Sequence, residues 1–429
     1  MILSTRELDK MYQKTTLDNG IRIVTEEIPY VKSVSIGFWI VVGSRNERRD
    51  ENGISHFIEH MLFKGTKKRT AIQIAKEIDS VGGFLNACTN KEYTSFYAKV
   101  LSKDFSLAID LLSDIFLHSI FNPEEIEKEK QVILQEICMV EDTPDEHIQE
   151  LFNKSFFCNN PLSYSVIGNK ENVFAVNQTE MVDFFNEYYT SDRIIISVAG
   201  NLEHNEVVRR IEETLGSLPK KNGEIANDLT DLTRHVSVYQ KDLEQVHLCF
   251  GTKGLSQTHP MRYAGYVLNA VLGGGMSSRL FQEIRERRGL VYSVYSYMSS
   301  YSDIGLFTIY AGTDKETFNM VIELVTNELK KFKAHSLTEV ELQMAKEQLK
   351  GNLILACESI DNRMSKLAKG EIYFGRSVTI DEIIENIEKV TPEEVSQLAE
   401  DIFNKDYFSL ALLGNVQEEG LADDLLHLI

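Results

Sequence analysis

A stretch near the end of this chain repeats a stretch near its middle. Residues 188–202 match residues 402–416 at an offset of 214, and each reads as a turn, an apolar strand and a Gly-Asn pair. A helix-capping pattern precedes both stretches, since Asn177 and Thr391, also 214 apart, are each followed three residues later by a glutamate. A repeat at one fixed offset predicts that one fold is used twice.

A third match has the same offset. Gly37 and Gly251 lie 214 residues apart within apolar segments that read as strands. We therefore expect two homologous halves of about 210 residues. The boundary falls in a polar stretch with few apolar anchors, which divides the chain into an N-terminal domain (residues 1–218), a linker (219–234) and a C-terminal domain (235–429).

Each half mixes strand and helix patterns. In the first half, Asp18-Asn-Gly20 predicts a hairpin turn, and residues 34–42 predict a buried strand. A helix is expected after Gly53. Three further predictions are a helix opened by Thr70 and Gln73 and stopping at Gly82-Gly83, two strands within 84–100, and a long helix from Pro123 past Glu136. Strands for one layer and helices for the other predict an α+β fold, with a two-layer sandwich in each half.

The charge balance narrows the function. The 429 residues include 45 Lys and Arg against 65 Asp and Glu, a formal net charge of −20. A surface this negative repels phosphate backbones, so no nucleic-acid partner is expected. Two interpretations remain open: the charge serves solubility, or it marks an acidic cavity that takes basic peptides.

Cysteine usage and the apolar segments indicate the compartment. The five cysteines are widely spaced and form no CxxC pair, which fits a reducing cytosol. The first ten residues carry charges of both signs and no apolar core of a signal peptide, and no later window reaches the apolar length that spans a bilayer. We expect a cytoplasmic protein without a membrane partner.

The sequence His56-Phe-Ile-Glu59-His60 lies in the helix expected after Gly53. Histidines four residues apart share one helix face, about 6 Å apart along the axis, so both imidazoles reach a single tetrahedral ion. Glu59 shares that face, where a carboxylate is placed to take a proton from water at the metal. An exposed polar stripe is the alternative interpretation of this HxxEH pattern.

A catalytic zinc needs a third protein ligand. The long helix offers Glu129 and Glu136, which lie two turns apart on one face and interrupt an otherwise apolar run. Surface carboxylates are common on amphipathic helices, and the spacing alone does not choose between the two. Both therefore remain candidates at this point.

The motifs in combination resemble a known family. His60 is followed after 75 intervening residues by Glu136, with Glu129 seven positions before it. This arrangement is similar to the pitrilysin/insulinase superfamily of zinc metallopeptidases, in its processing-peptidase-like bacterial branch. The resemblance extends over nearly the whole chain and is carried by residues 53–66, 82–89 and 272–294.

The resemblance implies a role for each residue of the first half's motif. His56, His60 and Glu136 are implied as the ligands of one Zn²⁺ per chain, and Glu59 as the general base. Glu129 is implied to orient or polarise the site from outside the coordination sphere.

The second half lacks these ligands. At the offset of 214, the HxxEH positions fall on Ala270, Gly273 and Gly274, none of which ligates zinc. The run Gly273-Gly-Gly275 is not followed by the Lys-Ser/Thr of a phosphate-binding loop, so it is read as a connection before the next helix.

Two residues of the second half acquire a role by the resemblance. Arg287-Arg288-Gly289 reads as a helix end, which places Arg285 in the last turn and Tyr292 at the start of the next strand. By pattern alone, both are ordinary structural residues. The resemblance implies that Arg285 and Tyr292 hold the substrate backbone and help stabilise the oxyanion.

A strand after the double glycine is a candidate for peptide recognition. If it lies at a sheet edge, an extended peptide pairs with it through main-chain hydrogen bonds. Most such strands are internal, and it is the resemblance that implies substrate binding at Asn86 and Ala87.

We therefore expect a zinc endopeptidase that cleaves peptides or unfolded segments. The resemblance implies that each chain forms half of a clamshell around a closed chamber. Because one chain carries both the zinc motif and the Arg285/Tyr292 pair, we expect a homodimer in which the pair acts across subunits. The alternatives are a non-catalytic assembly subunit and a subunit that binds metal without hydrolysis.

Overall fold

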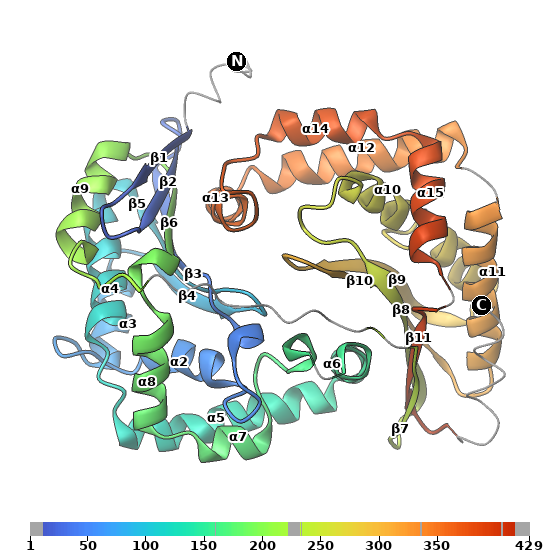
Figure 1. Ribbon diagram of the computed structural model, residues 1–429, viewed down its shortest axis with the longest axis horizontal. Coiled ribbons are helices and arrows are strands. Elements are labelled where there is room, and N and C mark those ends of the chain that lie inside the picture. The colour runs from blue at the N-terminus through green and yellow to red at the C-terminus, as the bar shows by residue number, and fades with distance from the viewer. Residues whose placement is uncertain are drawn as a thin grey trace. The chain divides into compact units, whose positions relative to one another are not determined.

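The protein is described by a computed structural model over residues 12–158, 160–221, 232, 234–334, 337–404 and 406–416. By its internal contacts the chain divides into two compact units, each of which draws on both halves of the sequence (Figure 1). As far as they are described, residues 1–139, 164–228 and 355–379 form the first unit, and residues 140–163, 229–354 and 380–429 form the second.

The linker expected at 219–234 falls mostly on residues 222–231 and 233, which lie outside the described residues. The placement of the boundary between the duplicated halves therefore stays a prediction.

The first unit is built on a six-stranded sheet with the order β1-β2-β6-β3-β5-β4. β2 and β6 are parallel, and the other neighbouring strands are antiparallel. β1 and β2 form the hairpin predicted around Asp18-Asn-Gly20, and β3 is the predicted buried strand. The strands are β1 (Tyr12–Thr16), β2 (Arg22–Glu27), β3 (Ser33–Ile40), β4 (Phe84–Thr89), β5 (Thr94–Leu101) and β6 (Ile194–Gly200).

Helices cover one face of this sheet and bury its apolar side chains. Along β3, Val34, Ile36 and Phe38 belong to the core beneath the helices, because alternate residues of a strand share a face. The predicted capping box opens α3, where the Thr70 side chain accepts a hydrogen bond from the Gln73 amide. The helices are α2 (Ile54–Leu62), α3 (Ala71–Ser80), α4 (Phe105–His118), α5 (Pro123–Asp142), α7 (Lys170–Ala175), α8 (Gln178–Tyr188) and α9 (His204–Leu215).

The second unit repeats this plan. Its sheet has the order β7-β11-β8-β10-β9, which matches β2-β6-β3-β5-β4 strand for strand. The strands are β7 (Val236–Gln240), β8 (Gln245–Gly254), β9 (Val291–Ser300), β10 (Gly305–Asp314) and β11 (Ser409–Gly414). Its helices are α10 (Arg262–Leu272), α11 (Phe318–Ala334), α12 (Glu339–Ala356), α14 (Ile380–Lys389) and α15 (Pro392–Ile402).

The duplication extends to the helix caps. α8 and α15 lie 214 residues apart, and each begins with a full capping box, Asn177 with Glu180 in one and Thr391 with Glu394 in the other. Both predicted caps are confirmed. The repeated strand order and the repeated caps confirm the predicted α+β fold of two homologous halves.

Each sheet is completed on its other face by a helix from the other half of the chain. α6 (Pro144–Phe157) packs on β8 and β11 of the second sheet, and α13 (Ile360–Phe374) packs on β2, β3 and β6 of the first. Figure 1 shows α13 beside the first sheet and α6 beside the second. The exchange is reciprocal, because the two helices occupy nearly the same positions of the repeat.

The repeated glycines lie under these exchanged helices. A Cβ atom added to Gly37 would meet Met364 Sδ of α13 at 2.6 Å, and one added to Gly251 would meet Phe152 Cζ of α6 at 2.6 Å. A strand residue without a side chain lets a helix approach the sheet closely. The glycine repeat in the sequence therefore marks the contact with the exchanged helix.

Candidate metal centre

The helix that carries the HxxEH motif is capped from outside. α2 begins after Gly53, which has a φ of +102° and no side chain to cap the helix. Glu47 takes this role: its carboxylate accepts hydrogen bonds from the Gly53 amide at 2.8 Å, the Ser55 amide at 2.9 Å and Asn52 Nδ2 at 2.9 Å. Glu47 is buried, and this burial raises its pKa to about 7 against the opposing effect of the bonds.

The structure brings His56, His60 and Glu136 together. One ligand atom from each lies within 4.8 Å of the other two. Glu136 Oε2 lies 3.7 Å from His56 Nε2 and 3.6 Å from His60 Nε2. Two ligands bound to one tetrahedral zinc lie about 3.3 Å apart, as follows from metal–ligand bonds of about 2.0–2.1 Å. Two imidazoles and a carboxylate at these separations fit a zinc ion that keeps one position open.

The choice between Glu129 and Glu136, which spacing left open, follows from which side of the His60 ring each faces. Glu129 Oε1 lies 2.9 Å from His60 Nδ1, whereas Glu136 lies beside Nε2. With its proton on Nδ1, the ring donates to Glu129 and presents a lone pair at Nε2 to a metal. Glu136 is thus the carboxylate at the candidate metal position. Glu129 holds the His60 ring by a hydrogen bond at the opposite nitrogen, Nδ1.

The pKa values fit this division. Burial, with a smaller effect of His60, lowers the pKa of His56 to about 3, so His56 is in the neutral state that binds metals. Burial alone would lower the pKa of His60, but its hydrogen bond to Glu129 and the nearby carboxylates outweigh this and raise it. Burial would raise the pKa of Glu129, but the bonds from His60 and Lys64 hold it below its usual value.

Glu59 is held by β4. The Thr89 hydroxyl donates a hydrogen bond to Glu59 Oε2 at 2.5 Å, and the Thr89 amide bonds to the same carboxylate. Burial raises the pKa of Glu59 above its ordinary value, and the two bonds from Thr89 oppose this rise. A carboxylate with a raised pKa, next to a candidate metal position, has the properties of a general base.

β4 is an edge strand, as peptide addition requires. Within the described strands it pairs with β5 alone and stands last in the sheet order. Asn86 is exposed, and its side-chain oxygen accepts a hydrogen bond from the Ala87 amide at 2.9 Å. The structure therefore places Asn86 and Ala87 on a strand edge that leads directly to Thr89.

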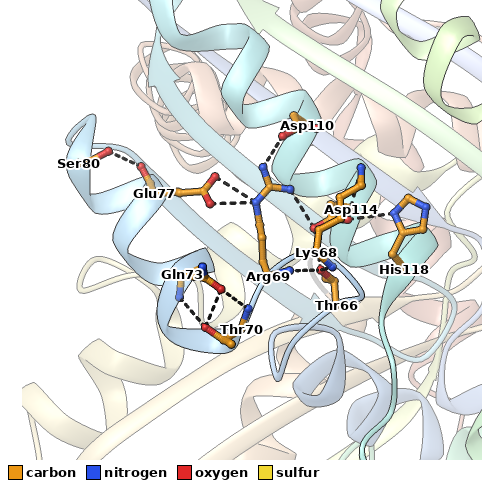
Figure 2. A network of polar contacts seen from close by, with 10 residues as sticks. All are labelled: Thr66, Lys68, Arg69, Thr70, Gln73, Glu77, Ser80, Asp110, Asp114 and His118. Carbon is orange, nitrogen blue, oxygen red and sulfur yellow. Dashed lines mark hydrogen bonds and ion pairs between the residues drawn. The ribbon is translucent and has the colours of Figure 1, made fainter.

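The segment after α2 is fixed by a polar network (Figure 2). Arg69 donates to Asp114 at 2.9 Å, and Thr66 donates to the same carboxylate at 2.8 Å. Arg69 also bonds Glu77 of α3 and Asp110 of α4. Asp114 is buried, so these bonds join the segment after the motif helix firmly to α3 and α4.

Arg285 and Tyr292 lie in the second unit. Arg285 is in the last turn of η6 (Phe281–Glu286), a π-helix, and Tyr292 lies in β9, as the helix-end pattern predicts. Gly289, with a φ of +64°, ends the turn, and its amide bonds the Arg285 carbonyl. The Arg285 guanidinium lies 5.2 Å from the centre of the Tyr292 ring, which is 77% exposed. The structure brings the pair together, and its approach to a zinc site stays a prediction.

Two residues that the sequence analysis did not single out bond to the carboxylates it did: Lys64 bonds to Glu129, and Thr89 bonds to Glu59. Lys64 Nζ lies 2.6 Å from Glu129 Oε2. Its position four residues after His60, two residues past the end of α2, is a weak signal, because helical spacing does not extend to it. Thr89 has no such signal, because it reaches Glu59 from a different element.

The fold and the site define a class of protein: a duplicated α+β chain in which, among the described residues, one metal-ligand cluster is found and lies in the first half. Two family models match the chain, "Insulinase (Peptidase family M16)" over residues 22–170 and "Peptidase M16 inactive domain" over residues 175–349. The chain belongs to peptidase family M16, the pitrilysin/insulinase superfamily that its motifs resemble.

Relatives and solved structures agree with this assignment. The chain is 44% identical over 403 residues to an uncharacterized zinc protease of Bacillus subtilis, covering 94% of this chain and 98% of that protein. It is 38% identical over 415 residues to an uncharacterized zinc protease of Streptomyces coelicolor, covering 95% and 90%.

Two crystal structures share the fold. One is a protease from Helicobacter pylori, with a TM-score of 0.88 and 21% identity, covering 94% of this chain and 99% of that one. The other is a peptidase M16 inactive domain from Pseudomonas fluorescens, with a TM-score of 0.89 and 18% identity, covering 95% and 98%.

In the described part of this chain, no helix combines the length and apolarity that crossing a bilayer needs.

Proposed function

We propose that this protein is a zinc endopeptidase that hydrolyses peptides or unfolded segments. The observation that carries the proposal is the convergence of His56, His60 and Glu136, together with the carboxylate of Glu59 on the same helix, which Thr89 holds by a hydrogen bond. The uncharacterized zinc proteases similar to this chain support zinc as the metal. We expect one zinc per chain, because one cluster of possible ligands is found among the described residues. When bound, zinc supplies a Lewis acid that acidifies water and polarises the scissile carbonyl.

The protein's own groups then move the proton. Glu59 accepts a proton from the attacking water and returns it to the nitrogen of the leaving amine. Glu129 keeps the His60 ring in the tautomer whose Nε2 faces the metal position. Lys64 balances the charge of Glu129, which is buried.

The substrate is held in an extended conformation. The edge of β4 offers main-chain groups near Asn86 and Ala87 to a peptide that adds as a further strand. Such binding selects unfolded segments, because a folded chain does not present a free strand of this kind. The net charge of −20 agrees with a preference for basic peptides.

The second half contributes Arg285 and Tyr292, which bind the substrate backbone and stabilise the oxyanion. We expect a homodimer in which this pair reaches the zinc site of the partner. Mixing Glu59→Gln chains with Arg285→Ala chains should then restore one working site per mixed dimer. No recovery of activity, once subunit exchange has been verified, would contradict action across subunits.

The first test of the function is a quenched-fluorescence peptide assay on the wild type and Glu59→Gln, with zinc content measured for both. We expect zinc in both proteins and cleavage by the wild type, with the rate of the variant lower by about a hundredfold or more. Equal rates would exclude Glu59 as the general base.

A second candidate function is a non-catalytic assembly or metal-binding subunit. The name of the model that matches residues 175–349, an inactive domain, agrees with it. Zinc bound by the wild type without cleavage of any peptide would favour this candidate.

We propose the cytoplasm as the location of the protein, because its cysteines are free and a reducing compartment keeps cysteines in that state. Cell fractionation would test this location.

A further inference from the structure

Thr89 joins the open edge of the first sheet to Glu59. It is the last residue of β4, and its side chain is directed at the α2 helix rather than at solvent. Its hydroxyl lies 2.5 Å from Glu59 Oε2, its amide bonds to the same carboxylate, and the residue is 9% exposed. Since little water competes with these bonds, they define the rotamer of Glu59 strongly.

We propose that Thr89 is a positioning residue for the general base, and that a peptide added to the edge of β4 acts through it on Glu59. This inference rests on the proposed function and deepens it. Glu59 must aim one oxygen at water beside the metal position, and Thr89 fixes the other oxygen. The substrate would bind along the same strand, at Asn86 and Ala87, two to three residues before Thr89.

We therefore expect main-chain pairing of a peptide with β4 to affect the position of Glu59 through Thr89. Asn86, Ala87 and Thr89 belong to one unbroken strand, so a peptide paired with the free edge of β4 ends within two to three residues of the group that holds Glu59. Binding energy from substrate residues remote from the scissile bond then appears in kcat rather than only in KM. Substrates too short to pair with β4 should be turned over slowly even at saturation.

The neighbouring strand offers a matched control. Thr94 of β5 is the cross-strand partner of Thr89 and is also buried, but its hydroxyl donates to the Val42 carbonyl at 3.0 Å. Thr89→Val and Thr94→Val remove the same group from adjacent positions in one sheet. Only the first removes a bond to Glu59, and Thr89→Ser restores that bond.

The experiment measures kcat and KM separately on a long peptide. We expect Thr89→Val to lower kcat by about ten- to a hundredfold, with KM within about twofold of wild type. Thr89→Ser should recover most of kcat, and Thr94→Val should keep it. Zinc content and the thermal midpoint are measured on every variant, and we expect Thr89→Val to match Thr94→Val in both.

Three results would overturn the inference: wild-type kcat in Thr89→Val, an equal loss of kcat in Thr94→Val, or no recovery in Thr89→Ser. The link to the strand edge is tested with a peptide shortened at the end that pairs with β4. Shortening should lower kcat more in the wild type than in Thr89→Val, and equal factors in both would overturn the link.

The failure of the proposed function looks different. If the zinc-loaded wild type cleaves no peptide, the peptidase proposal fails, and the role of Thr89 fails with it. If the wild type cleaves and Glu59→Gln does not, while Thr89→Val behaves as wild type, the function stands and the inference about Thr89 alone is wrong.

Discussion

At the scale of single residues, the candidate metal centre is surrounded by charged groups outside the cluster of His56, His60 and Glu136. Glu129 is buried, and two groups compensate its charge: the His60 ring at 2.9 Å and Lys64 Nζ at 2.6 Å. Removing one of the two partners of such a buried charge leaves the charge only partly compensated. We therefore expect Lys64 to help keep the His60 ring in place through Glu129, although Lys64 is not one of the three clustered residues.

Substituting Lys64 tests whether its contact with Glu129 affects the His60 ring. We expect Lys64→Met to weaken zinc binding by about ten- to a hundredfold, because Glu129 loses a partner and its hold on the His60 ring changes. Lys64→Arg should retain most of the affinity. The measurement is a zinc dissociation constant from competition with a chelator. The exposed Lys67, on the same loop, gives the control Lys67→Met, and equal affinity in both Met variants would show that Lys64 has no such role.

At the scale of elements, local patterns predicted the positions of the candidate residues where the signal lies within one element. Capping boxes and turn residues placed α3, α5 and the first hairpin, and helical spacing placed His56 and His60 on one face. Patterns failed where two elements must meet. Spacing on α5 did not separate Glu129 from Glu136, because only the approach of α2 decides which carboxylate faces which ring nitrogen. The bond from Thr89 has the same origin.

The cap of α2 gives a prediction about pH. Glu47 has a pKa of about 7 in the folded protein and an ordinary value of 4.5. The folded state thus binds the proton more tightly than the unfolded state, so stability falls as pH rises from about 4.5 to about 7 and stays lower above it. The shift corresponds to a loss on the order of 3 kcal/mol.

The measurement is urea unfolding of the metal-free protein at several pH values between 4.5 and 7.5. Glu47→Gln should lose this part of the pH dependence, since an amide does not titrate. Glu212→Gln, an exposed site on α9, should keep the wild-type slope. The same slope in all three proteins would mean that Glu47 does not titrate in this range.

At the scale of the whole molecule, the chain is two repeats that exchange one helix. α13 covers the first sheet through apolar contacts with Trp39 and Ile195, and ion pairs fix it at its ends, among them Lys14 with Glu371 and Lys99 with Asp361. α6 covers the second sheet mainly through phenylalanines, Phe152 and Phe156 among them. No local pattern predicts the exchange, because each helix has an apolar face that either sheet would satisfy. Its trace in the sequence is the pair of glycines 214 residues apart.

Those glycines allow the exchange to be tested from both sides. Gly37→Ala places a Cβ against Met364 and the indole of Trp39, and Gly251→Ala places one against Phe152. Each overpacks one contact, so we expect a loss of about 1–3 kcal/mol in either variant. Hydrogen exchange should rise along α13 in Gly37→Ala and along α6 in Gly251→Ala, so that each variant serves as the control for the other.

Gly351→Ala in α12 completes the comparison, because an added Cβ there meets nothing within 4 Å. Alanine is the better helix former, so this variant should gain about 0.5–1 kcal/mol and leave exchange in α6 and α13 unchanged. Suppose that Gly37→Ala and Gly251→Ala both have the wild-type free energy of unfolding and the wild-type hydrogen exchange in α6 and α13. These glycines would then not be needed for the close approach of helix to strand. The matching positions in the repeat would then need another explanation than the exchange of helices.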